Sequence, residues 1–176
     1  MILDAFRHAA RQHNGQLRKG KDASPYINHL IDVAHILWEI GGVRDVEVIV
    51  AGILHDTVED SDTTEEGIAR DFGPGIASVV MEVTDDRSLV KRERKRLQIE
   101  HAASLSYNAK LVKLADKISN VSDMIEHPPA KWSAKRLHEY IDWGEKVIDR
   151  LRGTNAALEH HFDTIARKAR EKINSG

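Results

Sequence analysis

Apolar residues recur at helical spacing along almost the whole chain. Because successive apolar positions lie three or four residues apart, residues 111–121 and 137–151 each predict an amphipathic helix. Residues 46–54 are apolar on nearly every side, which predicts a helix buried in the centre of the protein. A further stripe is formed by Ile27, Leu30, Ile31, Ala34, Leu37 and Trp38.

Local signals set the expected ends of these helices. Ser24 and Pro25 are expected to cap and open the helix that carries the stripe over 27–38, and Gly41-Gly42 to end it. The Thr and Glu residues of 62–66 predict a capping box for a short helix that stops at Gly73. Pro74 then opens the next helix, and others are expected from about 91 to 106 and from about 155 onward.

The pattern contains no strand-like alternation and no internal repeat. The loops expected at 15–25, 84–90 and 126–131 are short, so a division into two domains has little support. The sequence therefore predicts one all-α domain over residues 1–176, a bundle of about eight to ten helices.

Composition narrows the class of protein further. The chain has 176 residues, of which 41% are hydrophobic and 31% charged, with no signal-peptide pattern and no stretch long enough to span a membrane, so we expect a cytoplasmic protein without a membrane partner. The net charge of −2 argues against a nucleic-acid partner, and the basic run over 91–96 is interrupted by Glu93 and has no aromatic residues for base stacking. The absence of cysteine excludes a disulfide framework, a thiol nucleophile and an iron–sulfur cluster.

The densest polar cluster follows the most hydrophobic helix. His55 and Asp56 come directly after residues 46–54, where an unpartnered His-Asp pair would be costly to desolvate. A divalent metal is the simplest partner, because imidazole and carboxylate are good ligands for manganese, iron or zinc. Glu59 and Asp60 follow four residues after His55 and Asp56, so all four side chains are expected to share one helical surface.

Two more polar residues interrupt apolar stripes and could complete a coordination sphere. His29 lies in the first stripe, and Asp116 lies within 111–121. Together with His55 and Asp56 they offer two imidazoles and two carboxylates from three helices, which leaves positions open for water and a substrate oxygen. The alternative is that His29 is an ordinary core histidine and that Asp116 pairs with a neighbouring lysine.

The order of these residues resembles the HD superfamily of metal-dependent phosphohydrolases, which has an all-α fold. Longer blocks, at 26–29, 54–64, 82–86 and 111–117, resemble the hydrolase domain of the RelA/SpoT family, and the resemblance covers about residues 3–160. With no room for a synthetase or regulatory domain, the chain is similar to the stand-alone small alarmone hydrolases, a group that includes the metazoan SpoT homologues.

The resemblance implies a metal centre and a reaction. In that family one divalent ion, usually Mn²⁺, is held by the residues that match His29, His55, Asp56 and Asp116. The matches of Glu59 and Asp60 orient or activate the water that attacks the 3′-pyrophosphate of guanosine tetra- or pentaphosphate, which yields GDP or GTP and pyrophosphate. For Glu59, a general base and an outer partner that fixes a ligand are equally open roles.

The resemblance also assigns the residues that bind the substrate. Arg18 and Lys19 match contacts to the guanine base and a nearby phosphate, Asn120 a contact to the ribose, and Tyr140 a contact to the ribose or the 5′ side. Further pocket contacts are expected from Tyr26, Lys91, Trp132 and Arg136. Leu30 and Ile118-Ser119 depart from the residues that are commoner in the family, beside the site but not at a ligand position.

Two other functions compete with this one. The same chemistry could act on another nucleotide, such as the 2′-phosphate of NADPH, or the chain could be a nucleotide-binding module without catalysis. A non-catalytic module predicts a damaged ligand set, whereas every ligand position is occupied here. The sequence leaves the oligomeric state open.

Overall fold

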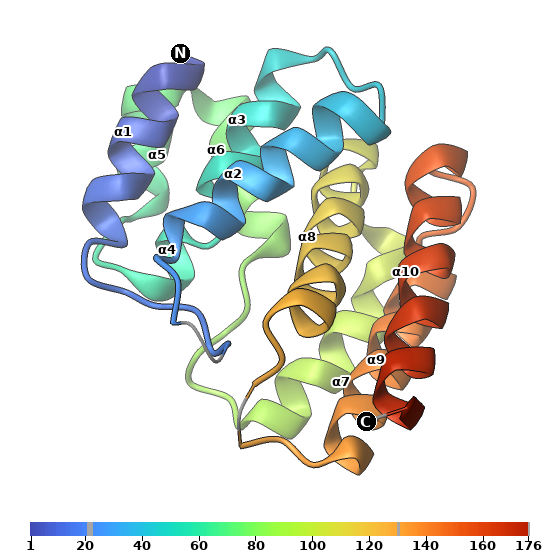
Figure 1. Cartoon of the computed structure of the whole chain (residues 1–176). Helices are drawn as coiled ribbons and strands as arrows, with labels where there is room; N and C mark the ends of the chain where they lie inside the picture. The colour runs from blue at the N-terminus through green and yellow to red at the C-terminus, as the bar shows by residue number, and fades with distance from the viewer. Residues whose placement is uncertain (21–22, 130, 176) are drawn as a thin grey trace.

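The computed structural model describes residues 1–20, 23–129 and 131–175 (Figure 1). Within these residues the chain forms ten α-helices, a π-helical segment and a 3₁₀ turn, and its β-type pairing is limited to an isolated bridge between Leu17 and Pro25. The elements in chain order are α1 (Ile2–Gln12), α2 (Ile27–His35), η1 (Ile36–Ile40), α3 (Val46–Leu54), α4 (Thr57–Asp60), α5 (Glu65–Phe72), α6 (Pro74–Val83), α7 (Lys91–His101), η2 (Ala102–Ser104), α8 (Tyr107–Glu126), α9 (Ala134–Asp149) and α10 (Ala156–Ser175).

The all-α class and the expected number of helices are confirmed. The assignment of residues 1–176 to a single domain stays a prediction. Residues 21–22 and 130 of the expected loops, and residue 176 of the expected domain, lie outside the described residues.

Most predicted helix ends are confirmed, and two are wrong. Pro74 opens α6, and the Thr64 hydroxyl caps α5 by accepting from the backbone N–H of Gly67. Ser24 does not cap α2 and Pro25 does not open it, because the helix begins only at Ile27. Both residues instead lie beside the segment 17–18: the Ser24 carbonyl accepts from the Arg18 N–H at 2.8 Å, and Pro25 forms a bridge with Leu17. The helix expected to reach residue 106 ends at His101, because the 3₁₀ turn η2 follows and Ser106 already caps the next helix.

The predicted stripe over 27–38 becomes α2 and its continuation η1. In η1 the Gly41 N–H donates to the Ile36 carbonyl at 2.9 Å, five residues back, which widens the last turn. Gly42 then takes a positive φ of +63°, a conformation that glycine adopts without steric cost, and the chain leaves the helix as predicted.

The longest buried stretches belong to α3 and α8. Every residue from 48 to 54 of α3 is buried, as its apolar pattern predicts. α8 packs against α2, α3, α6, α9 and α10, and in Figure 1 it lies between the α1–α6 group and the α9–α10 pair. Among the described residues, no helix combines the length and the apolar character needed to cross a membrane. These two helices bring the C-terminal end of α3 and the middle of α8 together in the core.

Candidate active site

Three parts of the fold bring the predicted metal ligands together. His29 lies in α2, His55 and Asp56 form the junction between α3 and α4, and Asp116 lies in the middle of α8. Ligand atoms of His29, His55 and Asp116 all lie within 4.8 Å of one another. The Asp56 Oδ2 atom lies 3.0 Å from His55 Nε2 and 3.6 Å from His29 Nε2. The four side chains therefore form one cluster.

Each imidazole ring directs a buried nitrogen toward carboxylate oxygens. The His55 Nδ1 atom lies 2.9 Å from the Gly52 carbonyl, which can only accept, so Nδ1 holds the proton and Nε2 is free to act as a ligand. The His29 Nδ1 atom lies 2.9 Å from the Ser119 hydroxyl. The Nε2 atoms of His29 and His55 are both buried and make no hydrogen bond. Lone pairs that face carboxylates repel them unless a cation lies between, so this donor set fits a divalent metal.

The charges around the cluster also favour a cation at its centre. Burial lowers the pKa of His55, but Asp56 and Asp116 outweigh burial and raise this pKa to about 10. The carboxylates thus favour a positive charge at Nε2, which either a proton or a metal ion can supply. Burial raises the pKa of the Asp116 carboxyl, yet Lys117 and the two histidines hold it well below its usual range. Burial likewise raises the pKa of Asp56, but His55 outweighs burial and lowers it. Both carboxylates are therefore charged at neutral pH, as metal ligands must be.

Neighbouring side chains fix the orientation of both carboxylates. The Tyr26 hydroxyl donates to Asp56 Oδ2 at 2.5 Å, and the Lys117 ammonium donates to Asp116 Oδ2 at 2.8 Å. The Asn120 amide donates to the other oxygen of Asp116. Contacts of this kind set the direction in which a ligand points and so influence the affinity for a metal.

The predicted catalytic carboxylates lie on α4. The spacing of His55 and Glu59 predicted one continuous helix, and this is wrong. The helix is broken between them, because α3 ends at Leu54 and α4 begins at Thr57. The Thr57 hydroxyl donates to the Leu54 carbonyl at 2.6 Å, and this hydrogen bond stabilises the interruption between α3 and α4. Burial, together with Asp56 and Asp85, raises the pKa of Glu59. A carboxylate with a raised pKa is suited to accepting a proton near neutral pH.

A cavity of about 690 Å³ opens beside this cluster, a size typical of small-molecule sites. His29 lies behind its wall, and Arg136 lies outside it, exposed, with its guanidinium 4.3 Å from the centre of the Trp132 ring. The other predicted site residues all line the cavity: Arg18, Lys19, Tyr26, His55, Asp56, Glu59, Asp60, Lys91, Asp116, Asn120, Trp132 and Tyr140.

Arg18 is held in place at one side of the cavity. Its guanidinium donates to Asp123 and to Asn120, each at 3.1 Å. Asn120 thereby links Arg18 to the predicted ligand Asp116. This network orients Arg18 toward the cavity before any ligand binds.

The cavity is also lined by Lys95 and Trp143, which the sequence alone does not predict as site residues. The Lys95 ammonium lies 5.0 Å from the centre of the Tyr140 ring and 4.3 Å from that of Trp143. Burial, and then Lys91 and Lys117, lower the pKa of Lys95 to about 8. The spacing of Lys91 and Lys95, four residues apart on α7, was a usable signal, since such residues lie on one helix face.

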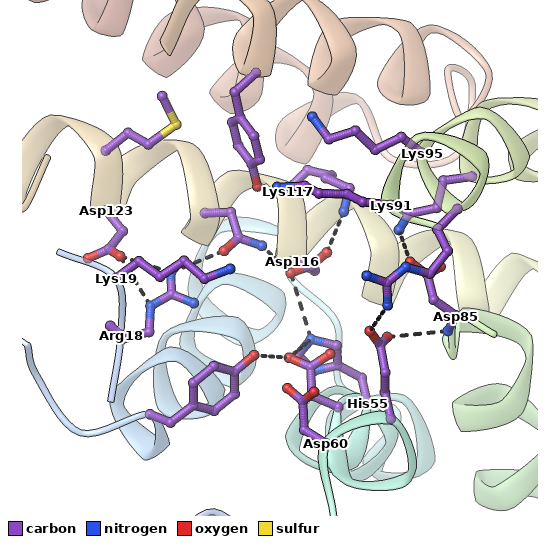
Figure 2. A pocket seen from close by; sticks show the side chains of 18 of the residues that line it. Arg18, Lys19, His55, Asp60, Asp85, Lys91, Lys95, Asp116, Lys117 and Asp123 are labelled. Atoms are coloured by element: carbon purple, nitrogen blue, oxygen red, sulfur yellow. Dashed lines mark hydrogen bonds and ion pairs between the residues drawn. The ribbon is translucent and has the colours of Figure 1, made fainter. Parts of the chain in front are cut away.

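The two sides of the cavity thus carry opposite charges. Figure 2 shows Lys91 and Lys95 across the cavity from His55 and Asp60. One side offers carboxylates and imidazoles that fit a metal, and the other offers ammonium groups beside aromatic rings. The arrangement fits a ligand with an aromatic group and phosphates at more than one position.

An all-α bundle that supplies histidine, a His-Asp pair and a distant aspartate to one buried cluster defines an HD-domain protein. In agreement, a family model described as HD domain matches residues 5–141. The chain is 51% identical over 165 residues to guanosine-3′,5′-bis(diphosphate) 3′-pyrophosphohydrolase MESH1 of Danio rerio, covering 94% of this chain and 92% of that protein. It is 49% identical over 158 residues to the Homo sapiens protein of the same name, covering 90% and 88%. The chain therefore belongs to the HD-domain family and, within it, to the group of these pyrophosphohydrolases.

A solved structure leads to the same group. It is described as a metazoan orthologue of SpoT that hydrolyses ppGpp, and it superimposes with a TM-score of 0.92 at 46% sequence identity. The match covers 95% of this chain and 94% of the other. The resemblance to the RelA/SpoT hydrolases inferred from the sequence is confirmed.

Proposed function

We propose that this chain hydrolyses the 3′-pyrophosphate of guanosine tetra- and pentaphosphate, which releases pyrophosphate and GDP or GTP. The observation that carries the proposal is the cluster of His29, His55, Asp56 and Asp116, whose buried Nε2 atoms and carboxylates meet beside a cavity of nucleotide size. The names of the similar proteins support this substrate over other nucleotides.

We also propose that the site holds one manganese ion. Two imidazole nitrogens and two carboxylate oxygens form a donor set that manganese accepts, and other divalent ions share this preference. A divalent ion at this position supplies Lewis acidity, which neutralises phosphate charge and makes a water molecule more acidic.

The protein's own residues supply the remaining steps. Glu59 and Asp60, which line the cavity next to the cluster, orient the attacking water, and Glu59 either accepts its proton or fixes a ligand from outside. Lys91 and Lys95 hold phosphates that are not cleaved, and Asn120 and Tyr140 hold the sugar. Because these groups come from α4, α7, α8 and α9, substrate binding and water activation use different helices.

The test is the release of pyrophosphate from guanosine tetraphosphate by the purified protein. We expect release with manganese, none with excess chelator, and none from the His55→Ala variant, which removes a ligand. His160→Ala is the matched control, because this histidine is exposed on α10, away from the cavity. Metal content per chain, measured by mass spectrometry, should fall in His55→Ala and stay unchanged in His160→Ala.

The other outcomes are equally informative. If the protein binds manganese but releases no pyrophosphate, the proposed substrate is wrong, and release of phosphate from NADPH is the next assay. If His55→Ala retains both manganese and activity, the proposed metal site is wrong.

A further inference from the structure

The loop between α6 and α7 reaches across the cavity wall to the predicted catalytic carboxylates. Arg87, in this loop, has its Nε atom 3.1 Å from Glu59 Oε1, and a terminal nitrogen of the same guanidinium contacts the Asp60 carboxylate. One side chain therefore bridges both acids.

The loop is anchored rather than loosely exposed. The Gln98 amide donates to the Asp85 carboxylate at 2.6 Å, and the Asp86 carboxylate accepts from the Ser88 N–H at 2.9 Å. The backbone N–H of Asp85 donates to Glu59 Oε2 at 3.3 Å. The loop thus donates a hydrogen bond to each oxygen of the Glu59 carboxylate, one from Asp85 and one from Arg87.

Electrostatic repulsion explains why Glu59 needs these two contacts. Glu59 lies among carboxylates, and those of Asp56 and Asp85 disfavour its charged form. Without a cation beside them, neighbouring carboxylates repel one another and turn toward water. A guanidinium is planar and presents donors in a rigid fork, so it can hold two carboxylates in a fixed relation, which a lysine ammonium does less well.

We propose that Arg87 is a positioning residue, which holds Glu59 and Asp60 in the arrangement that hydrolysis requires. This inference rests on the proposed function. The Arg87 side chain is 55% exposed, and an exposed ion pair adds little to stability, so the ion pairs of Arg87 orient the two acids rather than stabilise the fold. Arg94, whose terminal nitrogen lies 3.5 Å from the same Glu59 oxygen, assists, but among the described residues it makes no ion pair with Asp60.

The test compares Arg87→Ala and Arg87→Lys with the control Arg92→Ala. Arg92 is exposed on α7 and does not line the cavity. With guanosine tetraphosphate and manganese, Arg87→Ala should lower kcat by roughly 10- to 100-fold, the scale of a small misplacement of reacting groups, while KM changes little. Arg87→Lys should recover part of the loss, because it restores the charge but not the fork. Arg92→Ala should match the original protein.

A second measurement does not depend on activity. Exchange of the Asp85 amide proton, followed by NMR, should be several-fold faster in Arg87→Ala than in Arg92→Ala, because a released Glu59 no longer accepts from that N–H.

A rise in KM with unchanged kcat would make Arg87 a substrate contact and overturn the inference, as would unchanged kinetics. If the original protein does not hydrolyse the substrate, the proposed function fails on its own, and the exchange rate then decides: unchanged exchange in Arg87→Ala overturns the positioning role.

Discussion

Lys95 carries a charge that the protein leaves available for a ligand. Its ammonium lies against the rings of Tyr140 and Trp143, and the described residues offer it no ion pair. The Trp143 indole N–H donates to the carbonyl of Lys95 at 3.0 Å, which fixes the ring relative to α7. Since aromatic faces stabilise a cation without neutralising it, Lys95 keeps its attraction for phosphate.

The pH dependence of the reaction should therefore include Lys95. Because its pKa is about 8, Lys95 is charged below this pH and neutral above it. We expect kcat/KM to fall as the pH rises through 8, since the neutral amine no longer attracts phosphate. In Lys95→Met, kcat/KM should be lower at neutral pH and this decline should be absent, whereas Lys168→Met, an exposed control on α10, should keep it. An identical decline in Lys95→Met would assign the titration to another group.

Tyr26 should act on the metal through Asp56. In Tyr26→Phe the hydroxyl that donates to Asp56 Oδ2 is lost, while the ring that stacks on His13 remains. We expect manganese affinity to fall by roughly 10- to 100-fold, as for other contacts that orient a ligand. Calorimetric titration measures the affinity, and Tyr107→Phe, which alters an exposed ring at the start of α8, is the control. Equal affinity in both variants would show that the hydroxyl does not orient Asp56.

How far the sequence predicts this site depends on the distance between partners along the chain. His29, His55 and Asp116 are recognisable because each is a polar residue within an apolar pattern. The role of Lys95 depends on Trp143, 48 residues further on, and that of Arg87 on Glu59, 28 residues earlier. Such pairings depend on the packing of α7 against α9 and on the course of one loop, which local patterns do not encode.

At the scale of the helices, the sequence predicts that a helix forms more reliably than it predicts the residues at which the helix begins and ends. The apolar run of α3 and the proline of α6 define these helices unambiguously. Ser24 looks like a cap but instead pairs with Arg18 across a bridge, a contact made between two parts of the chain. The π-helical turn at 36–40 also has no local signal, and the apolar pattern does not predict α1.

The end of η1 offers a test of backbone conformation alone. Gly42 has φ +63°, and an added Cβ would meet no atom within 4 Å. Gly42→Ala should therefore lower the free energy of unfolding by about 1 kcal/mol through the cost of positive φ. Gly42→Asn should lose less, because asparagine tolerates this region better.

Urea unfolding measures the free energy of unfolding of both variants. Gly67→Ala is a control in which this free energy should change in the opposite direction. Gly67 lies within α5, where its Cβ would lie 3.5 Å from the Thr64 hydroxyl, an ordinary contact. Alanine at this position should raise the free energy of unfolding by about 0.5–1 kcal/mol. Equal stability of Gly42→Ala and the original protein would contradict the argument.

At the scale of the whole molecule, the ligand cluster joins segments that are distant in sequence. α2 and α8 each contribute one predicted ligand and the junction of α3 and α4 contributes two, so an ion bound there would link the N-terminal helices to the central helix. An ion that binds only the folded protein stabilises it by mass action, by about 2.7 kcal/mol at a concentration 100 times its Kd.

Manganese should accordingly raise the Tm by several degrees in a protein of this size. Thermal unfolding followed by circular dichroism should show the shift in the original protein and in His160→Ala, and chelator should reverse it. His55→Ala should show almost none, because a ligand is missing. A shift of equal size in His55→Ala would mean that the stabilising ion binds elsewhere.

The opposite charges on the two sides of the cavity have a consequence for how such an enzyme can change over evolutionary time. The bond-breaking side is built by α2, α3, α4 and α8, while α7 and α9 supply much of the opposite side. Substitutions at Lys91 and Lys95, which face the opposite side of the cavity, can therefore alter which nucleotide is preferred without touching the hydrolytic cluster. Such a division of labour lets an enzyme acquire a new physiological role while its chemistry is inherited intact.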